Sequence, residues 1–334
     1  MRSIVFTSPY VAEFIEEEIP AVGKTDVLVK LVCSTVSPGT ERANFIGDPN
    51  VSPAHEPRVK FPRRVGYSSA GIVAKVGEGV TGVKVGDRVA CFKSVHSEYC
   101  VMDEKYAHPI PDELTFSEAA MLHIATFPLA AIRKCRLEIG ESAIVMGQGM
   151  LGMMAVGLLR AAGACPIIAV DPVKEKRDQA LTLGADYALD PFAPDFANRV
   201  KEITGGGVNV AIEVTGKGQG LDMVLDCMAR FGRVALLGCT RISDFSIDYY
   251  RKVHAPGITL VGAHTNARPD RESSPGWWSS WDDTDALIKL ILTKRIDIFS
   301  LVAETHSTEK AQEVYTRLAN EPTFPVVQFD WSEI

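Results

Sequence analysis

The chain has 334 residues, of which 46% are hydrophobic and 23% charged, and its formal net charge is −7. This composition is typical of a globular protein with enough apolar material for two domains. Because the chain is mildly acidic and contains no block of lysines and arginines, we expect no nucleic acid partner. The seven cysteines are odd in number, scattered and without a CxxC pair, which disfavours a disulfide framework or a thiolate zinc cluster.

No segment reads as a membrane or export signal. The N-terminal run MRSIVFTSPYVAEFIEEEIP alternates apolar and polar residues and contains acids, unlike a signal peptide. Residues 142–170 carry a single charge, Arg160, but glycines and Pro166 divide them into pieces that suit a buried α/β core. We therefore expect a cytoplasmic protein with no membrane partner.

The first 115 residues are predicted to be rich in β-strand. Runs of β-branched or alternating apolar and polar residues occur at 27–36, 69–76 and 96–101. A helix is expected to begin near Ser117, with Thr115 or Ser117 as its N-cap, and Pro128 is expected to kink it.

From residue 142 the pattern alternates between short apolar strands and helices. The expected strands are 143–146, 167–170, 187–189, 208–214, 234–237 and 258–261. The expected helices between them are 151–162, 174–183, 195–203 and 219–229. This alternation favours an α/β fold with a doubly wound parallel sheet covered on both faces. Beyond residue 263 the pattern is mixed, with expected helices at 285–292 and 308–318 and a strand at 325–329.

The strongest chemical signal is the glycine-rich run GQGMLG at 147–152. It follows an expected strand and opens an expected helix, and Asp171 stands at the end of the next strand. In a dinucleotide-binding unit such glycines permit a tight turn, close approach to a pyrophosphate and packing of helix on strand. The N–H groups of the helix N-terminus then bind the phosphate. The alternative is a turn in an α/β domain that binds no nucleotide.

Asp171 decides which cofactor is expected. A carboxylate there accepts hydrogen bonds from an adenosine ribose diol and repels a 2′-phosphate, so NAD is favoured over NADP. Lys174, Lys176 and Arg177 follow closely; they keep NADP open, or they form a solvated helix face. The residues expected to bind the cofactor are Gly147, Gly149, Met150, Leu151, Gly152, Asp171, Lys176, Thr215 and Gly238.

Short motifs along nearly the whole chain resemble the medium-chain dehydrogenase/reductase superfamily. They are GYSSAGIVAKVG at 66–77, the GxGV and GDRV pattern at 77–89, Glu98-Tyr99, Pro111, the run GQGMLG, Gly184-Ala185-Asp186 and Thr215-Gly216. The resemblance implies a GroES-like, β-rich catalytic domain built from both chain ends, residues 1–121 and 265–334. The NAD-binding Rossmann domain, residues 122–264, is inserted between them. It also implies a cleft between these domains and a homodimer or homotetramer.

The chain departs from this superfamily at the metal positions. Zinc alcohol and sorbitol dehydrogenases hold catalytic zinc with a cysteine in a C-G-S/T-D stretch, the histidine and glutamate of G-H-E, and one further acid or cysteine. In this sequence Pro38 occupies the cysteine place, Tyr67 and Ser68 replace the histidine and glutamate, and His123 aligns with the remaining position. Proline cannot ligate zinc, and tyrosine and serine are poor ligands, so we expect a member without zinc.

A site without zinc needs hydrogen-bond donors and an acid/base group in its place. We assign catalysis to Thr40, which falls at the family's proton-relay hydroxyl, to Tyr67 and to His123. The alternatives are that Tyr67 and His123 are satisfied core residues. We assign Glu41 and His96 to substrate binding; alternatively Glu41 pairs with an arginine across the core, and His96 only begins a strand.

The segment 263–285 is unusually polar and contains three of the four tryptophans, at positions 277, 278 and 281. Charged residues surround them: Arg268, Arg271, Glu272, Asp282 and Asp283. One hypothesis is a lid, in which Trp277 and Trp278 stack on a sugar or cyclitol ring while the charged groups bind hydroxyls. The other is a loop with buried aromatic residues at a subunit interface.

The sequence therefore predicts an NAD-dependent, zinc-independent dehydrogenase that interconverts a secondary alcohol and a ketone, with a sugar or polyol as its small-molecule substrate. One alternative is an NADPH-dependent quinone or enoyl reductase of the same fold, with a flatter and less polar pocket. Another is a nucleotide-binding structural protein without turnover, similar to a lens crystallin.

Overall fold

The computed structural model describes residues 1–51, 60–269 and 272–333. They form two compact units: unit 1 consists of Met1–Ile124 and Ile298–Ile334, and unit 2 of Ala125–Asp297. The first division falls inside helix α2, Phe116–Lys134. Residues 265–297, which we expected in the domain of the chain ends, fold within unit 2.

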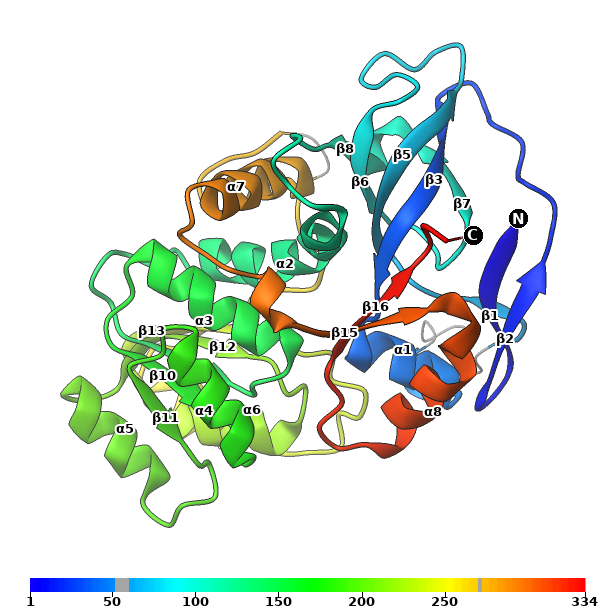
Figure 1. Ribbon diagram of the computed structural model, residues 1–334. Helices are drawn as coiled ribbons and strands as arrows, with labels where there is room; N and C mark the ends of the chain where they lie inside the picture. The colour runs from blue at the N-terminus through cyan, green and yellow to red at the C-terminus, as the bar shows by residue number, and fades with distance from the viewer. Residues whose placement is uncertain (52–59, 270–271, 334) are drawn as a thin grey trace. The chain divides into compact units, whose positions relative to one another are not determined.

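Unit 1 contains two sheets (Figure 1). The smaller has the order β2–β1–β4 and is antiparallel; the larger has the order β15–β16–β3–β5–β6–β8, and β7 also pairs with β3. Only the β15–β16 pair in the larger sheet is parallel. The strands are β1 Arg2–Ser8, β2 Val11–Glu16, β3 Asp26–Thr35, β4 Arg63–Arg64, β5 Ser68–Val76, β6 Arg88–Phe92, β7 Tyr99–Asp103, β8 Ala107–Pro109, β15 Val302–Ser307 and β16 Val326–Asp330.

Two α-helices of unit 1 lie side by side, α1 (Pro38–Phe45) and α8 (Ala311–Asn320). Single helical turns occur at η1 Pro49–Val51, η2 Glu104–Tyr106, η4 Phe299–Leu301 and η5 Thr308–Lys310. The sequence pattern did not predict α1, because its first residues, Pro-Gly-Thr, are typical of a turn. Proline is tolerated at the first helical position, where its missing N–H would have no intrahelical partner.

The core of unit 1 joins the two ends of the chain. The ring of Phe6 lies edge-on to Phe45, with centroids 5.1 Å apart, and to Tyr315, at 4.7 Å. Phe329 and Trp331 belong to the same buried cluster. Because aromatic side chains bury large apolar areas, this cluster fixes α1, α8 and the C-terminal strand on β1.

Unit 2 is built on a six-stranded sheet in which every pairing is parallel. Its order is β11–β10–β9–β12–β13–β14, which is the doubly wound Rossmann order with the direction reversing between β9 and β12. The strands are β9 Ala143–Met146, β10 Ile167–Val170, β11 Tyr187–Leu189, β12 Val208–Glu213, β13 Met228–Leu236 and β14 Thr259–Gly262. All residues of β9 and β10 are buried, as expected for strands covered on both faces.

The helices of unit 2 follow the strands in the predicted alternation (Figure 1). They are α3 Met150–Ala162, α4 Lys174–Thr182, α5 Phe196–Thr204, α6 Gly218–Asp226, the π-helical turn η3 Tyr250–His254 and α7 Ser280–Leu292. The prediction for α7 was wrong at its start. The helix begins five residues before the expected 285, because the Ser279 hydroxyl accepts a hydrogen bond from the Asp282 N–H.

Helix α2 has Thr115 at its N-terminus, one of the two N-cap residues predicted from the sequence. Thr115 and Glu118 form a capping box: the Thr115 N–H donates to the Glu118 carboxylate at 2.8 Å, and the Glu118 N–H donates to the Thr115 hydroxyl at 3.2 Å. Pro128 lies inside the helix, which continues beyond it to Lys134. Among the described residues, no helix is both long and apolar enough to cross a bilayer.

Candidate active site

The glycine-rich run lies between β9 and α3, at the carboxyl end of the central strands of unit 2. A Cβ on Gly152 would lie 1.9 Å from the Gly147 carbonyl oxygen, so only glycine lets α3 approach the turn. A Cβ on Gly149 would meet nothing within 4 Å, which leaves open space beside the N-terminus of α3. Met150 and Leu151 form the first turn of that helix. The backbone therefore has room for a pyrophosphate at a helix N-terminus.

Asp171 connects the end of β10 to this turn. Its side chain is 6% exposed; Oδ2 accepts a hydrogen bond from the Gln148 N–H at 2.8 Å, and Oδ1 accepts one from the Val173 N–H at 2.9 Å. Each carboxylate oxygen retains a second lone pair for a donor such as a ribose hydroxyl. Within the described residues, the buried Oε1 of Gln148 also has no hydrogen-bond partner. The arrangement fits an adenine dinucleotide.

The ends of β12 and β13 complete the nucleotide turn. Buried Glu213 accepts hydrogen bonds from the Thr215 and Gly216 N–H groups, at 2.8 and 3.1 Å, and from the Thr215 hydroxyl. Burial raises the pKa of the Glu213 carboxyl. A Cβ on Gly238 would lie 2.3 Å from the Gly216 nitrogen. The structure thus brings predicted Thr215 and Gly238 together and adds Glu213, a lone acid at the end of an apolar strand that sequence reasoning missed.

Lys176 is the predicted cofactor residue that the structure does not bring to Asp171. It lies half-buried on α4, and no hydrogen bond of the described residues joins the two. The neighbouring Arg177 is the residue that contacts Asp171. Its guanidinium donates to the main-chain carbonyl oxygens of Asp171 and Pro172 at 2.8 and 2.9 Å.

In unit 1, Tyr67 and His123 come together as predicted. Their ring centroids lie 5.7 Å apart in an edge arrangement, and His123 stacks on Phe92 at 4.6 Å. Tyr67 follows Gly66, whose φ is +94° and whose Cβ would lie 2.8 Å from the His96 nitrogen. The Tyr67 hydroxyl shares a hydrogen bond with the hydroxyl of Ser37, a residue that sequence reasoning missed.

Thr40, the third predicted catalytic residue, lies on α1. Its carbonyl oxygen accepts a hydrogen bond from the Asn44 amide at 2.8 Å. No hydrogen bond of the described residues connects its hydroxyl to Tyr67 or His123.

The superfamily's metal positions carry proline, tyrosine and serine in this chain, which are poor zinc ligands. Pro38 is the first residue of α1, and the buried Ser68 hydroxyl donates to the Ala120 carbonyl at 2.6 Å. Nowhere in the described ranges do three or more His, Cys, Asp or Glu side chains gather as a metal-binding group. Burial also raises the pKa of the Cys91 and Cys100 thiols, to about 11 for Cys100, and so disfavours the thiolate that zinc requires. The donor set does not fit zinc.

Glu41 and His96 form a buried pair, 1% and 0% exposed, with Glu41 Oε2 3.1 Å from His96 Nε2. The same oxygen accepts a hydrogen bond from the Tyr315 hydroxyl at 2.6 Å. His96 Nδ1 shares a hydrogen bond of 2.7 Å with Ser34. The acid therefore pairs across the core with histidine and tyrosine instead of the arginine considered from the sequence, and the proposed contact of both residues with substrate stays a prediction.

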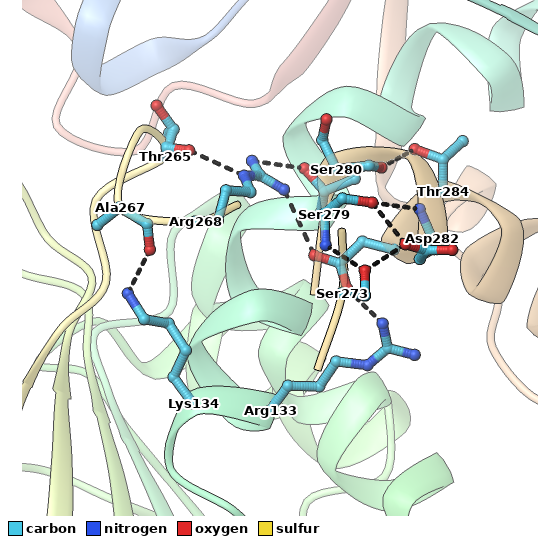
Figure 2. A network of polar contacts seen from close by, with 12 residues as sticks. Arg133, Lys134, Thr265, Ala267, Arg268, Ser273, Ser279, Ser280, Asp282 and Thr284 are labelled. Atoms are coloured by element: carbon cyan, nitrogen blue, oxygen red, sulfur yellow. Dashed lines mark hydrogen bonds and ion pairs between the residues drawn. The ribbon is translucent and has the colours of Figure 1, made fainter. Parts of the chain in front are cut away.

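The tryptophan-containing segment rests on the end of α2, within unit 2. Figure 2 shows Arg133 and Lys134 pointing from α2 toward this segment. The Arg133 guanidinium lies 4.5 Å from the Trp278 ring centroid, and the Lys134 ammonium lies 5.0 Å from that of Trp277. Lys134 also donates to the carbonyl oxygens of Gly262 and Ala267. One face of each indole is therefore covered by a cation of the same unit, while Trp277 remains 48% exposed.

Two charged groups that we expected to bind substrate hydroxyls are instead buried in a structural ion cluster. Asp283 is 0% exposed and lies 2.5 Å from Arg133 and 3.4 Å from Arg268. Burial raises its pKa to about 6 against the effect of the two arginines. Arg268 also donates to the Thr126 hydroxyl at 3.1 Å. Figure 2 shows it donating to the Thr265 carbonyl oxygen. The expectation for Arg271 lies outside the described residues.

Fold and turn geometry together define a protein of two units, one of them built on a dinucleotide-binding Rossmann sheet. The sequence matches the family described as alcohol dehydrogenase GroES-like domain over residues 23–112, and the family described as zinc-binding dehydrogenase over residues 151–276. The chain belongs to the medium-chain dehydrogenase/reductase superfamily and is an enzyme of its alcohol dehydrogenase class.

Two relatives and one structure illustrate the similarity. The chain is 32% identical over 236 residues to (R,R)-butanediol dehydrogenase of Bacillus subtilis, covering 61% of this chain and 67% of the relative. It is 29% identical over 292 residues to L-threonine 3-dehydrogenase of Pyrococcus abyssi, covering 78% and 82%. The fold matches the crystal structure of galactitol-1-phosphate dehydrogenase from Escherichia coli with a TM-score of 0.85 and 19% identity, covering 99% of this chain and 100% of the other.

Proposed function

We propose that this protein is an NAD-dependent, zinc-independent dehydrogenase that interconverts a secondary alcohol and a ketone on a sugar or polyol. The observation that carries the proposal is that Pro38, Tyr67 and Ser68 stand at the superfamily's metal positions, with Tyr67 packed beside His123 and hydrogen-bonded to Ser37. A phenol and an imidazole can hold and move a proton where a zinc ion would polarise the alcohol.

The choice of NAD rests on Asp171. Its carboxylate is fixed by two backbone N–H groups and keeps lone pairs for a ribose diol, whereas a 2′-phosphate there would meet like charge. When bound, the nicotinamide supplies the hydride acceptor. The turn at 147–152, with Thr215 and Gly238, holds the dinucleotide backbone.

The acid/base role in moving the proton of the substrate hydroxyl is assigned to Tyr67. In the oxidising direction the ionised Tyr67 oxygen takes the hydroxyl proton of the alcohol and becomes the neutral phenol; in the reducing direction the phenol gives that proton to the substrate oxygen and becomes ionised again. His123 packs edge-on to the ring and restricts its orientation, while Thr40 is assigned to passing the proton onward. General acid–base catalysis of this kind contributes about 10²–10⁴-fold to the rate.

Two observations support the proposed substrate class, the names of the relatives and an exposed indole. Butanediol and threonine, in the names of the two relatives, both carry a secondary hydroxyl next to a second polar group. In this chain the exposed indole of Trp277, backed by Lys134, offers an apolar face for the C–H surface of a sugar or polyol ring. If the segment 263–285 instead lies at a subunit interface, a substitution of Trp277 leaves substrate affinity unchanged.

The proposal is tested by a single screen of the purified protein. Zinc is measured by elemental analysis, and NAD reduction is followed by absorbance against polyols, aldoses, glycosides and simple alcohols, before and after chelation. We expect no stoichiometric zinc, turnover that survives chelation, and a preference for polyhydroxylated substrates. Stoichiometric zinc whose removal abolishes turnover would contradict the mechanism.

Tyr67→Phe is expected to lower kcat about 100-fold at constant fold, because the phenolic proton is lost. Tyr106→Phe is the matched control, because it removes a phenolic hydroxyl that accepts a hydrogen bond from Lys93 at 3.0 Å. Normal turnover of Tyr67→Phe would remove Tyr67 from the mechanism.

Trp277→Ala is expected to raise KM for polyols without changing KM for simple alcohols.

We further propose a cytoplasmic homo-oligomer. All seven cysteines are free, and five of them are buried, which suits a reducing compartment.

A further inference from the structure

Ser37 stands at the N-cap of α1 but does not cap the helix. An N-cap serine normally accepts a hydrogen bond from an N–H of the first turn. In α1 no such bond is made, and the Ser37 hydroxyl shares its hydrogen bond with the Tyr67 hydroxyl. Ser279 of α7 shows the ordinary arrangement, accepting from the Asp282 N–H at 3.2 Å. The Ser37 hydroxyl is therefore withdrawn from a stabilising local role and committed to the phenol.

The backbone of Ser37 is fixed by the buried Glu41–His96 pair. Its N–H donates to Glu41 Oε1 at 2.8 Å, while Glu41 Oε2 binds His96 and the Tyr315 hydroxyl. Ser37 itself is 7% exposed. Every member of this network lies in unit 1 and is buried, so Ser37 has one well-defined position from which to reach Tyr67.

We propose that Ser37 is a positioning residue that orients the Tyr67 phenol and stabilises its ionised form, with the Glu41–His96 pair as its support. The inference rests on the acid/base role of Tyr67 under the proposed function. When the phenol gives its proton to the ketone oxygen, an O–H bond forms on the product and one is broken on Tyr67. The phenolate then accepts the Ser37 O–H as a hydrogen bond until a proton returns to it. The positive end of the α1 dipole also stabilises the negative charge of the phenolate.

The first test observes the phenol without any substrate. Tyrosines are labelled with ¹³C at Cζ, the Tyr67 signal is identified by its loss in Tyr67→Phe, and its ionisation is followed by NMR against pH. Ser37→Ala is expected to move the Tyr67 titration midpoint about one pH unit upward, because a hydrogen bond to the charged form is lost. Ser37→Thr restores the midpoint. Ser307→Ala, an exposed N-cap serine without a cap hydrogen bond, leaves it unchanged.

The second test separates positioning from folding. If the Ser37 hydroxyl does not cap α1, Ser37→Ala keeps the denaturant midpoint of the parent protein, whereas Ser279→Ala lowers it. A loss of stability in Ser37→Ala equal to that of Ser279→Ala, with an unmoved Tyr67 titration, would assign the hydroxyl to helix capping and overturn the proposal.

The third test is kinetic, on a substrate found by the screen. Ser37→Ala is expected to lower kcat about tenfold with little change in KM, to shift the pH profile of kcat toward higher pH, and to have no further effect in a Tyr67→Phe background. Wild-type turnover of Tyr67→Phe would defeat the proposed acid. An unmoved Tyr67 titration in Ser37→Ala would defeat only the role of Ser37, so the two failures are distinguishable.

Discussion

The Asp171 carboxylate joins the glycine-rich turn to the end of β10. Its oxygens accept hydrogen bonds from the N–H groups of Gln148 and Val173, and each keeps a second lone pair. Under the proposed function these lone pairs bind an adenosine ribose, so cofactor choice and the shape of the turn would depend on the same residue.

We predict that Asp171→Ser lowers the NAD-over-NADP ratio of kcat/KM at least tenfold. The loss of charge-assisted hydrogen bonds to the ribose diol costs about 1.5–3 kcal/mol, and like-charge repulsion of a 2′-phosphate disappears. The measurement is kcat/KM with each cofactor, and Asp178→Ser on the exposed face of α4 is the control. An unchanged ratio in Asp171→Ser would remove our cofactor assignment.

At the residue scale, local signals were sufficient only where chain neighbours determine the role. Gly152 and Asp171 lie close to the same turn, and their spacing predicted that position, while the cofactor role of Asp171 stays a prediction. Ser37 could not be found in this way, because its partner Tyr67 is 30 residues distant and the serine reads as an ordinary helix cap. The partner of Glu41 was equally hidden, since Tyr315 is 274 residues away.

At the scale of elements, β15 and α8 are joined by an ion pair that gives unit 1 a measurable pH dependence. Arg317 contacts both oxygens of Glu304, at 2.7 and 3.0 Å, and His306 lies 2.7 Å from the same carboxylate. These partners lower the pKa of Glu304 to about 2. A lowered carboxyl pKa contributes stability that is present above the unfolded value and is lost as pH falls through the folded value.

We therefore predict that Glu304→Gln lowers the free energy of unfolding by about 1 kcal/mol at pH 7, a figure reduced for the solvent exposure of the pair. The difference from the parent protein shrinks as pH falls below about 4.5 and vanishes below pH 2, where both proteins carry a neutral side chain at this position. Denaturant unfolding at a series of pH values measures it. Glu309→Gln, on exposed η5, serves as control, and a pH-independent difference would refute the electrostatic origin.

Elements were predictable where periodicity and caps agree. The strands at 143–146, 167–170 and 187–189 match the structure residue for residue, because buried parallel strands form short apolar runs. Helices α1 and α7 were missed or misplaced at their N-termini. There a proline and a serine begin a helix within segments whose glycines, prolines and polar residues are typical of loops.

At the scale of the whole molecule, the resemblance of motifs supplied what periodicity could not. Apolar patterning predicts a Rossmann sheet from 142 onward, but it gives no reason for residues 298–334 to return to the N-terminal part. The structure provides that reason in the aromatic cluster of Phe6, Phe45, Tyr315, Phe329 and Trp331. Contacts between such distant residues are specified by complementary shape, which a single sequence does not display.

The edge of the unit 2 sheet carries the proposal of a homo-oligomer. Strand β14 pairs on one side with β13, and Leu260 is 37% exposed on an edge strand, TLVG, without charge or proline. Natural proteins usually cover an uncharged edge strand. A second copy of the chain, paired about a two-fold axis, would cover the β14 strands of both subunits at once. The Ala263 N–H donates to Leu236 in β13, so by alternation the N–H of Leu260 points away from β13.

This geometry separates assembly from folding. Leu260→Pro removes an outward N–H while leaving the β13 ladder intact, and we predict that it halves the mass measured by light scattering, with the far-UV circular dichroism unchanged. Leu260→Val keeps the N–H and the parent mass. Each subunit has a mass of 36.3 kDa, so dimer and monomer are readily distinguished. A parent protein that is monomeric at micromolar concentration, or a Leu260→Pro variant of undiminished mass, would show that β14 does not form the interface.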